Sequence, residues 1–475
     1  MARGSPSNEK LMADSYIRFE RELSGPNEVF MPDGRAFPHY RPVLGEMEKM
    51  GAGEWDRRVR RAHDRMLEEQ RGLGISGDTT HPTDYFPRVI PAADWGILER
   101  GLAQRMLAIN EWLRRLESGK DEVVPAEVIE SSALYDASIP TRFGSVPNRQ
   151  MGFDIVAVRR EVSWEYLVIE DNAKMPVGIE PMSLMRAHTV EVLPESYDML
   201  AVRPLSRLME RFGEVLKAAS KEPDPTLAVL STGPEDQYYL DHKFFAKELG
   251  ATLAERHEVE LDRGGFLVHK ASGRRLHVVY ERIENGRIYD DLPGLIESQV
   301  SGKVEAVFAP NLGIADDKGV YPFIPEMIRT YLGEEPVLHN AETYSLAVED
   351  ERRYVMDHFE ELVIKSRSGW GGNDVLIAPE ESQEDIEEFR KQVEENPIEY
   401  VAQTVLEFST HVLCESADRE IVLRDSYADY RIHALAPDAE TVEVVPGAMT
   451  RVATPGSKLV NISSGGKMKD AWVLR

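Results

Sequence analysis

The chain has 475 residues, enough for two or three domains, and 42% of them are hydrophobic and 29% charged, as in globular enzymes. Its net charge of −27 at pH 7 argues against nonspecific binding to nucleic acid, whose phosphates it would repel. The sequence contains no run of about 18 apolar residues and no apolar signal segment, so we expect no membrane partner. Cys414 is the single cysteine, which excludes an intrachain disulfide. Together these features predict a cytoplasmic protein.

The first part of the chain predicts helices followed by a pair of strands. Residues 1–145 predict a helical region, with a lead-in over residues 1–80 that prolines interrupt and a long amphipathic helix over about 92–116. Two β patterns follow at residues 154–158 and 164–169, each bounded by charged turns. We expect these two strands to pair as a hairpin.

The rest of the chain predicts a small α/β unit and then a mixed region. Helical patterning returns around residues 190–222, and strands then alternate with helices over 223–310, which is typical of a parallel sheet. Residues 311–475 are helix-rich up to about residue 361 and then mostly strand. An acidic amphipathic pattern at 380–389 predicts a helix exposed on the surface.

Oxygen-bearing side chains gather at one end of the predicted hairpin. Asp154 opens its first strand, and Glu170 and Asn172 close its second strand on the same face, whereas Asp171 points away. Carboxylate and amide oxygens suit Mg²⁺ that holds a nucleotide triphosphate. On these residues alone, a strand end that only caps a turn remains an equal alternative.

Candidate phosphate-binding residues lie later in the chain. Lys365 ends an apolar strand before a glycine-rich turn that contains Gly369, Gly371 and Gly372, and such a turn can direct backbone N–H groups at phosphates. Lys318 supplies a second cation near a helix start. The alternatives are a mobile loop and a capped surface turn.

Two arginines on the C-terminal strands, Arg431 and Arg451, suit anionic substrates, although each alone could form a surface ion pair. Asn461 precedes a pair of glycines. A P-loop is excluded, because Gly466-Lys467 is followed by Met468 and lacks the upstream glycine.

Together these residues resemble the ATP-grasp superfamily in a circularly permuted order, the glutathionylspermidine-synthase-like or type 2 permuted ATP-grasp family. The metal motif, which ordinarily comes last, here stands before the lysines and arginines. The resemblance spans most of residues 84–475 and rests on the following segments: 87–91, 170–178, 232–234, 241–242, 315–318, 400–403, 445–452, 461, 463–466 and 469–472.

The resemblance implies an α/β (α+β) fold, a circularly permuted ATP-grasp with a small parallel-sheet pre-ATP-grasp domain. Residues 1–145 would be the helical N-terminal region and 146–222 the permuted C-terminal part of the core with the metal-binding strands. Residues 223–310 would form the pre-ATP-grasp domain, and 311–475 the nucleotide-binding subdomains.

The resemblance also implies an ATP-dependent carboxylate–amine ligase that forms an amide through an acyl phosphate, with ATP and Mg²⁺ as cofactors. Its substrates would be a small carboxylate and an amine: an amino acid, a peptide or a polyamine. An inactive nucleotide-binding interaction protein and a small-molecule kinase are the alternatives. The implied roles are metal binding by Asp154, Glu170 and Asn172, nucleotide binding by Lys318, Lys365, Gly369, Gly371, Gly372, Val401, Gln403 and Asn461, and catalysis by Arg431 and Arg451.

Val177 departs from the family's motif, since the family has serine between the proline and the glycine of this segment. Acceptor substrates often approach there, so the substrate is the part of the function that the resemblance leaves open. The oligomeric state is not predicted.

Overall fold

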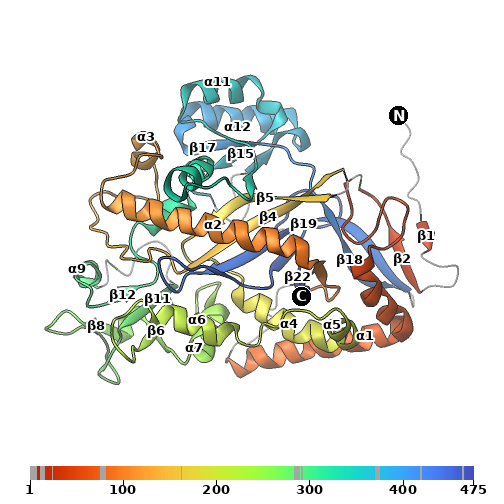
Figure 1. The fold of residues 1–475 in the computed structure, drawn as a ribbon, viewed down its shortest axis with the longest axis horizontal. Helices are drawn as coiled ribbons and strands as arrows, with labels where there is room; N and C mark the ends of the chain where they lie inside the picture. Colours follow the sequence, from red (N-terminus) through yellow and green to blue (C-terminus); the bar gives the residue numbers. More distant parts are fainter. Residues whose placement is uncertain are drawn as a thin grey trace.

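The computed structural model describes residues 16–23, 25–74, 82–161, 163–282, 289, 292–369, 375–417, 420–462 and 465–475, together with the backbone of 8–10. Within these residues the chain is a mixed α/β protein, as predicted, built around one large curled sheet with smaller sheets at either end (Figure 1). None of the helices in these ranges is long and apolar enough to cross a bilayer.

The large sheet follows the order β13-β5-β4-β19-β21-β22-β3, with β2, β18 and β20 also paired to β19 and β1 paired to β2. The predicted hairpin is its centre, because β4 and β5 pair antiparallel and β19 lies antiparallel on the other side of β4. β4 is buried along nearly its whole length, which explains why its sequence is an almost continuous apolar run. The strands are β1 (Asn8–Lys10), β2 (Ile17–Glu20), β3 (Arg88–Ile90), β4 (Gln150–Arg160), β5 (Ser163–Asn172), β13 (His339–Asn340), β18 (Thr410–Ala417), β19 (Glu420–Leu435), β20 (Glu443–Val444), β21 (Met449–Val452) and β22 (Lys467–Val473).

Three long helices pack around this sheet. The predicted amphipathic helix is α2 (Ala92–Glu117), whose buried side chains Trp95, Leu102 and Met106 belong to the main hydrophobic core. α4 (Ile179–Val192) packs on β22, and α1 (Arg41–Gly72) packs on α4.

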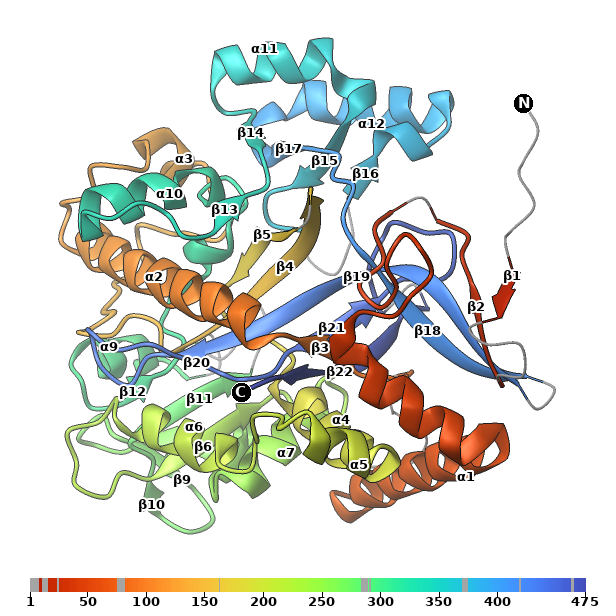
Figure 2. The same ribbon diagram turned by 45° about the vertical axis from the view of Figure 1, so that its right-hand side comes forward.

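The small parallel sheet predicted for residues 223–310 is present, in the order β12-β11-β6-β7 with every pair parallel. Figure 2 shows it with α6 and α7 at the opposite end of the molecule from α11 and α12. Its elements are β6 (Leu227–Ser231), β7 (Thr252–Glu255), β11 (Val278–Arg282), β12 (Glu305–Ala306), α6 (Leu208–Lys217), α7 (Tyr239–Glu248) and α9 (Leu295–Val300), with an antiparallel sheet of β8 (Val259–Leu261), β9 (Leu267–His269) and β10 (Arg274–Arg275) beside them.

A four-stranded antiparallel sheet, β14-β17-β15-β16, carries the predicted lysine strand. The acidic helix predicted at 380–389 is α12, which begins at the N-cap Ser382 and buries only Ile386 and Val393. The elements are β14 (Thr343–Ser345), β15 (Leu362–Ser366), β16 (Val375–Ile377), β17 (Tyr400–Thr404), α11 (Glu349–Asp357) and α12 (Gln383–Glu395).

Two local predictions are wrong. The N-terminal lead-in is not purely helical, since Ile17–Glu20 form a strand that pairs parallel with β19. The helix expected from about residue 190 begins earlier, at Ile179, after Gly178 with φ 137°. The remaining short helices are α3 (Ala126–Glu130), α5 (Pro194–Met199), α10 (Ile324–Met327), η1 (Pro38–Tyr40), η2 (Arg256–Glu258), η4 (Leu312–Asp316), η5 (Tyr321–Phe323), η6 (Ile328–Leu332), η7 (Phe359–Glu361), η8 (Ala378–Glu380) and η9 (Pro397–Glu399).

Candidate active site

Strand register brings the two predicted metal carboxylates together. Asp154 on β4 lies directly opposite Glu170 on β5, and a bulge follows immediately, because the next pair is Ile155 with Val168. Asp171 points away from Glu170, as predicted, and its carboxylate pairs with the buried Arg105 of α2 at 2.5 and 2.7 Å. Sequence and register therefore agree on which carboxylates face the site.

Asp154 is held by both predicted arginines. Its Oδ1 accepts from Arg431 Nε at 2.6 Å, and its Oδ2 accepts from Arg431 Nη2 at 2.7 Å and from Arg451 Nη2 at 2.6 Å. Burial alone would raise the pKa of Asp154, but the charges and hydrogen bonds of the two arginines outweigh it and hold that pKa well below its usual value. Neither arginine forms a surface ion pair, since their side chains are only 11% and 14% exposed.

The carboxylate of Asp429 forms a second ion pair with Arg451. It accepts from Arg451 Nε at 3.0 Å and from Nη2 at 2.5 Å, across the register pair of β19 and β21. Burial raises the pKa of Asp429, while Arg451 opposes this shift. Arg451 is thus shared between two buried carboxylates.

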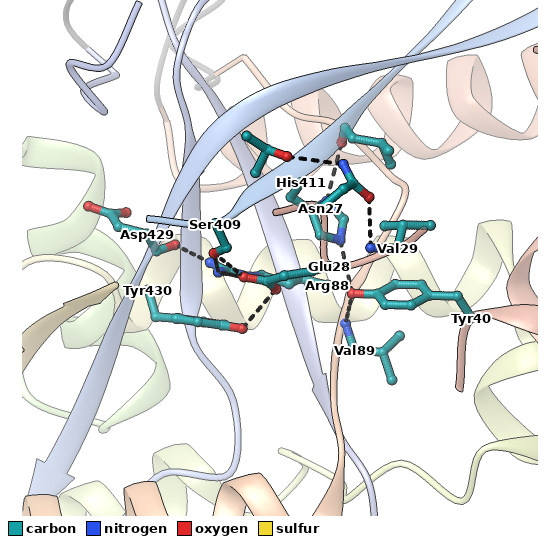
Figure 3. A network of polar contacts seen from close by, with 12 residues as sticks. Asn27, Glu28, Val29, Tyr40, Arg88, Val89, Ser409, His411, Asp429 and Tyr430 are labelled. Atoms are coloured by element: carbon teal, nitrogen blue, oxygen red, sulfur yellow. Dashed lines mark hydrogen bonds and ion pairs between the residues drawn. The ribbon is translucent and has the colours of Figure 1, made fainter. Parts of the chain in front are cut away.

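A second buried network fixes the backbone at Asp429 (Figure 3). Arg88 of β3, fully buried, donates from Nη1 to the carbonyl oxygen of Asp429 at 2.8 Å and pairs with both carboxylate oxygens of Glu28. Its guanidinium carbon lies 3.2 Å from the centre of the Tyr430 ring, and the Tyr430 hydroxyl donates to Glu28 at 3.1 Å. The N-terminal segment is therefore part of the support beneath the arginines.

The two predicted lysines approach the carboxylates from different elements, Lys365 from β15 of the antiparallel sheet and Lys318 from the turn after η4. Lys318 Nζ lies 2.9 Å from Glu170 Oε1 and donates to the carbonyl of Gly369 at 2.5 Å. Lys365 Nζ donates to Gln403 Oε1 at 2.5 Å. Burial lowers the pKa of Lys365 to about 8; Glu170 opposes that shift and Lys318 adds to it, so all these charges lie within range of one another.

A small hollow lies between these elements. It is lined by Glu170, Lys318 and Gln403 together with Asp316, Asp317 and Tyr321. The hollow lies between the C-terminal end of β5 and the β14–β17 sheet, with Glu170 on one side and Lys318 and Gln403 on the other.

The donor set suits Mg²⁺ only with help from a ligand. Among the described residues no three His, Cys, Asp or Glu side chains converge as a complete metal cage. Asp154, Glu170 and Asn172 offer two carboxylates and an amide oxygen near one end of the β4–β5 pair. This set fits Mg²⁺, which commonly binds one or two carboxylates and completes its shell with phosphate oxygens and water.

The remaining predicted residues have mixed placements. Val401 is buried opposite Lys365 in the register of β15 and β17, next to Gln403. Asn461 lies in the turn before β22, where its carbonyl accepts the amide of Gly466 at 3.1 Å. Gly371 and Gly372 lie outside the described residues.

Sequence reasoning missed two acidic residues. Asp429 stands two positions before Arg431 on one strand, and this spacing placed both side chains on the same face. Asp316 precedes Lys318 by two residues, accepts the backbone N–H groups of Ala173 and Lys174, and has its pKa raised by burial to about 7. Its burial, which decides its role, has no local signal in the sequence.

Comparison with known proteins gives the following relatives. The family described as circularly permuted ATP-grasp type 2 matches residues 87–453. A protein of Frankia alni named "Putative glutamate--cysteine ligase 2-3" is 31% identical over 97% of this chain, and the chain spans only 55% of that relative's length. An uncharacterized protein of Synechocystis sp. is 31% identical over 94% of this chain and 97% of its own.

One solved structure shares the fold. The apo form of a glutathione synthetase-like effector from Globodera pallida superimposes with a TM-score of 0.56 over 83% of this chain and 90% of that chain. Its sequence identity is 9%, so the similarity concerns the fold alone.

Proposed function

The chain belongs to the circularly permuted ATP-grasp type 2 family, and we propose that it is an ATP-dependent ligase that joins a carboxylate to an amine. The family match confirms the permuted order that the motifs indicated. The name of the Frankia relative directs the substrate proposal toward amino acids such as glutamate and cysteine.

One observation carries the proposal. Two carboxylates, Asp154 and Glu170, stand opposite each other on adjacent strands, and four cationic side chains converge on them. A site in which buried positive groups surround a pair of acidic metal ligands suits a polyphosphate better than it suits a neutral substrate. The cations are Lys318, Lys365, Arg431 and Arg451.

The chemistry follows from the poor reactivity of a carboxylate. A carboxylate does not condense with an amine in water, whereas its acyl phosphate does, releasing phosphate as the amide forms. Arg431 and Arg451 would bind the phosphoryl oxygens as the γ-phosphoryl group passes from ATP to the substrate carboxylate and ADP leaves with the electron pair of the broken P–O bond. Their N–H groups are already oriented by Asp154 and Asp429, so little reorganisation is needed.

Nucleotide binding would fall to the antiparallel sheet and to the turn that carries Lys318. Lys318 and Lys365 would contact the phosphates, and Gln403 with the adjoining Val401 backbone would border the base. Asp154, Glu170 and Asn172 would hold Mg²⁺, which when bound neutralises charge on the transferred phosphate. Closing the hollow would protect the acyl phosphate from water.

The test is turnover with Mg²⁺-ATP and a pool of L-glutamate, L-cysteine, other amino acids and polyamines. We expect ADP, free phosphate and a product with a new amide mass. Glu170→Gln should reduce turnover at least about 100-fold because it removes a metal carboxylate, while far-UV circular dichroism stays unchanged. The matched control is Glu165→Gln, the same change on the same strand, at a residue paired with Arg160 away from the cluster.

Three results would contradict the proposal. Nucleotide binding without turnover across the pool would favour a noncatalytic nucleotide-binding protein. A stable phosphorylated product without free phosphate would indicate a kinase. Equal rates for Glu170→Gln and Glu165→Gln would refute the metal assignment.

A further inference from the structure

The carboxyl edge of the small parallel sheet faces the active site. Ser231 ends β6 and Arg282 ends β11, and these two strands are neighbours. Ligands of open parallel sheets bind outside the carboxyl ends of the strands. At this edge the structure leaves polar atoms without partners, although they are enclosed by protein.

Arg282 and Asp241 form a buried ion pair in which several polar atoms lack hydrogen-bond partners within the described part of the chain. Their side chains are only 2% and 5% exposed, and Arg282 Nη2 donates to Asp241 Oδ2. Among the described residues, Arg282 Nε and Nη1 and Asp241 Oδ1 have no hydrogen-bond partner. Buried donors and acceptors are nearly always paired, so three unpaired atoms on one ion pair point to a ligand.

Two neighbouring polar side chains at this edge are paired. Ser231 Oγ and His242 Nδ1 lie 2.8 Å apart, and Ser231 Oγ also accepts the amide of Gly233 at 3.0 Å. Ser231 and His242 are therefore paired at this edge, whereas both ring nitrogens of the nearby His433 lack partners among the described residues, as do the atoms of Arg282 and Asp241.

This pair lies close to the proposed phosphoryl-transfer arginine. A β-carbon added to Gly178 would stand 2.7 Å from His433 Nε2 and 3.6 Å from Arg431 Cδ, so these side chains pack against one turn. Burial lowers the pKa of His433 to about 3, and both Arg431 and Arg282 add to that shift. His433, neutral at physiological pH, thus lies within electrostatic range of both arginines.

Glu180 on α4 completes the surroundings. Burial raises its pKa to about 8, and the charge of Asp241 adds to the shift, so Glu180 is mainly uncharged at pH 7. It lines a small hollow between α1 and α4 with Leu240, Met185 and Met468. An uncharged Glu180 does not repel a substrate carboxylate.

We propose that Arg282 and Asp241 bind the α-carboxylate and the α-ammonium group of an amino-acid substrate. A simple anion would satisfy the free N–H groups of Arg282 but would be repelled by Asp241, and an amine would be repelled by Arg282. A zwitterion supplies the acceptor and the donor that the pair lacks. This inference rests on the proposed ligase function and names one of its substrates as an α-amino acid.

Binding to the full-length chain, measured by calorimetry at pH 7 without nucleotide, tests the assignment. The probes are two series: L-glutamate, glutarate and γ-aminobutyrate, and L-cysteine, 3-mercaptopropionate and cysteamine. Within a series, the second compound lacks the α-ammonium group and the third lacks the α-carboxylate. We expect at least one amino acid to bind about 10- to 100-fold more tightly than both of its analogues, because each analogue leaves one charged hydrogen-bonding group unpaired.

The variants separate recognition from folding. Arg282→Gln should weaken amino-acid binding about 10- to 100-fold and leave ATP binding unchanged, whereas the matched control Arg263→Gln, at an exposed arginine beside β8, should change neither. Asp241→Asn preserves the volume and keeps Arg282, and it should let the deaminated acid bind as well as the amino acid. If Arg282→Gln does not fold, Asp241→Asn tests the assignment alone. The assignment then requires that Asp241→Asn no longer binds the amino acid more tightly than its deaminated analogue.

The outcomes also distinguish this inference from the proposed function. Amino-acid binding that depends on Arg282 in a protein without ligase turnover would refute the ligase and support the site. Turnover with an unchanged KM for the amino acid in Arg282→Gln and Asp241→Asn would refute the site and support the ligase. Binding of none of the probes would overturn the assignment.

Discussion

Replacing Lys365 with methionine should make the protein more stable and a weaker nucleotide binder. Lys365 lies between Gln403, which accepts its hydrogen bond at 2.5 Å, and the charges of Glu170 and Lys318. Burial disfavours its ammonium group and lowers its pKa from 10.5 to about 8. A phosphate ligand is what would make that charge favourable.

The magnitude follows from the pKa shift. At pH 7 Lys365 is protonated in both the folded and the unfolded chain, so the folded state carries the full penalty, and a shift from 10.5 to about 8 corresponds to about 3 kcal/mol. Above pH 8 the folded state releases the proton while the unfolded state keeps it. The stability of the wild type therefore rises, relative to Lys365→Met, until the pH passes 10.5 and the penalty is gone.

Urea unfolding at pH 7, 8.5 and 10 would measure this difference, with Lys391→Met as the control at an exposed lysine on α12. We expect Lys365→Met to be more stable by up to about 3 kcal/mol at pH 7 and by less than about 1 kcal/mol at pH 10. Its ATP affinity should fall about 10- to 100-fold, the value of a charged hydrogen bond. A stability difference that does not change with pH, or unchanged ATP affinity, would refute this account of Lys365.

Two further substitutions test the support of the arginines. Asp429→Asn should lower kcat about tenfold or more with unchanged ATP affinity, because Arg451 loses the charge that orients it. Steady-state kinetics measure kcat, and a nucleotide titration measures the ATP affinity. A loss of ATP affinity that matches the loss of kcat would contradict this role of Asp429. Arg88→Met should reduce the free energy of unfolding by about 3–5 kcal/mol because Glu28 is left buried without its partner. Adding Glu28→Gln should restore most of that loss in thermal unfolding, and an equal loss in the double variant would show that Arg88 acts through packing alone.

Local patterning accounts for much of the fold. The apolar run of β4, the alternation of strands and helices over residues 223–310 and the amphipathic pattern of α2 each depend on neighbours close in sequence, and each is confirmed. Pairing between β2 and β19 is different, since Ile17 pairs with Ile421. Nothing local to a four-residue strand specifies a partner so far along the chain.

The same distinction separates the predicted from the missed site residues. Asp154 opposite Glu170 follows from a hairpin, whose register is fixed by its turn. Asp429 became a partner of Arg451 only through the pairing of β19 with β21, and Arg88 reached Asp429 only because β3 joins β22 in parallel. Asp241 belongs to a segment of the family resemblance and Arg282 to none, but neither was assigned a role, because being unpaired is a property of burial.

Cross-strand register also explains how a permuted chain can build this site. Asp154 on β4 has Glu170 of β5 on one side and Arg431 of β19 on the other, and Arg451 of β21 pairs with Asp429 of β19. These residues lie across four adjacent strands, and the contacts depend on which strands are neighbours, whatever the order in which the chain visits them. Moving the β4–β5 hairpin ahead of the lysine and arginine strands preserves every one of these pairs. The chain order identifies the family, but the register determines the chemistry of the site.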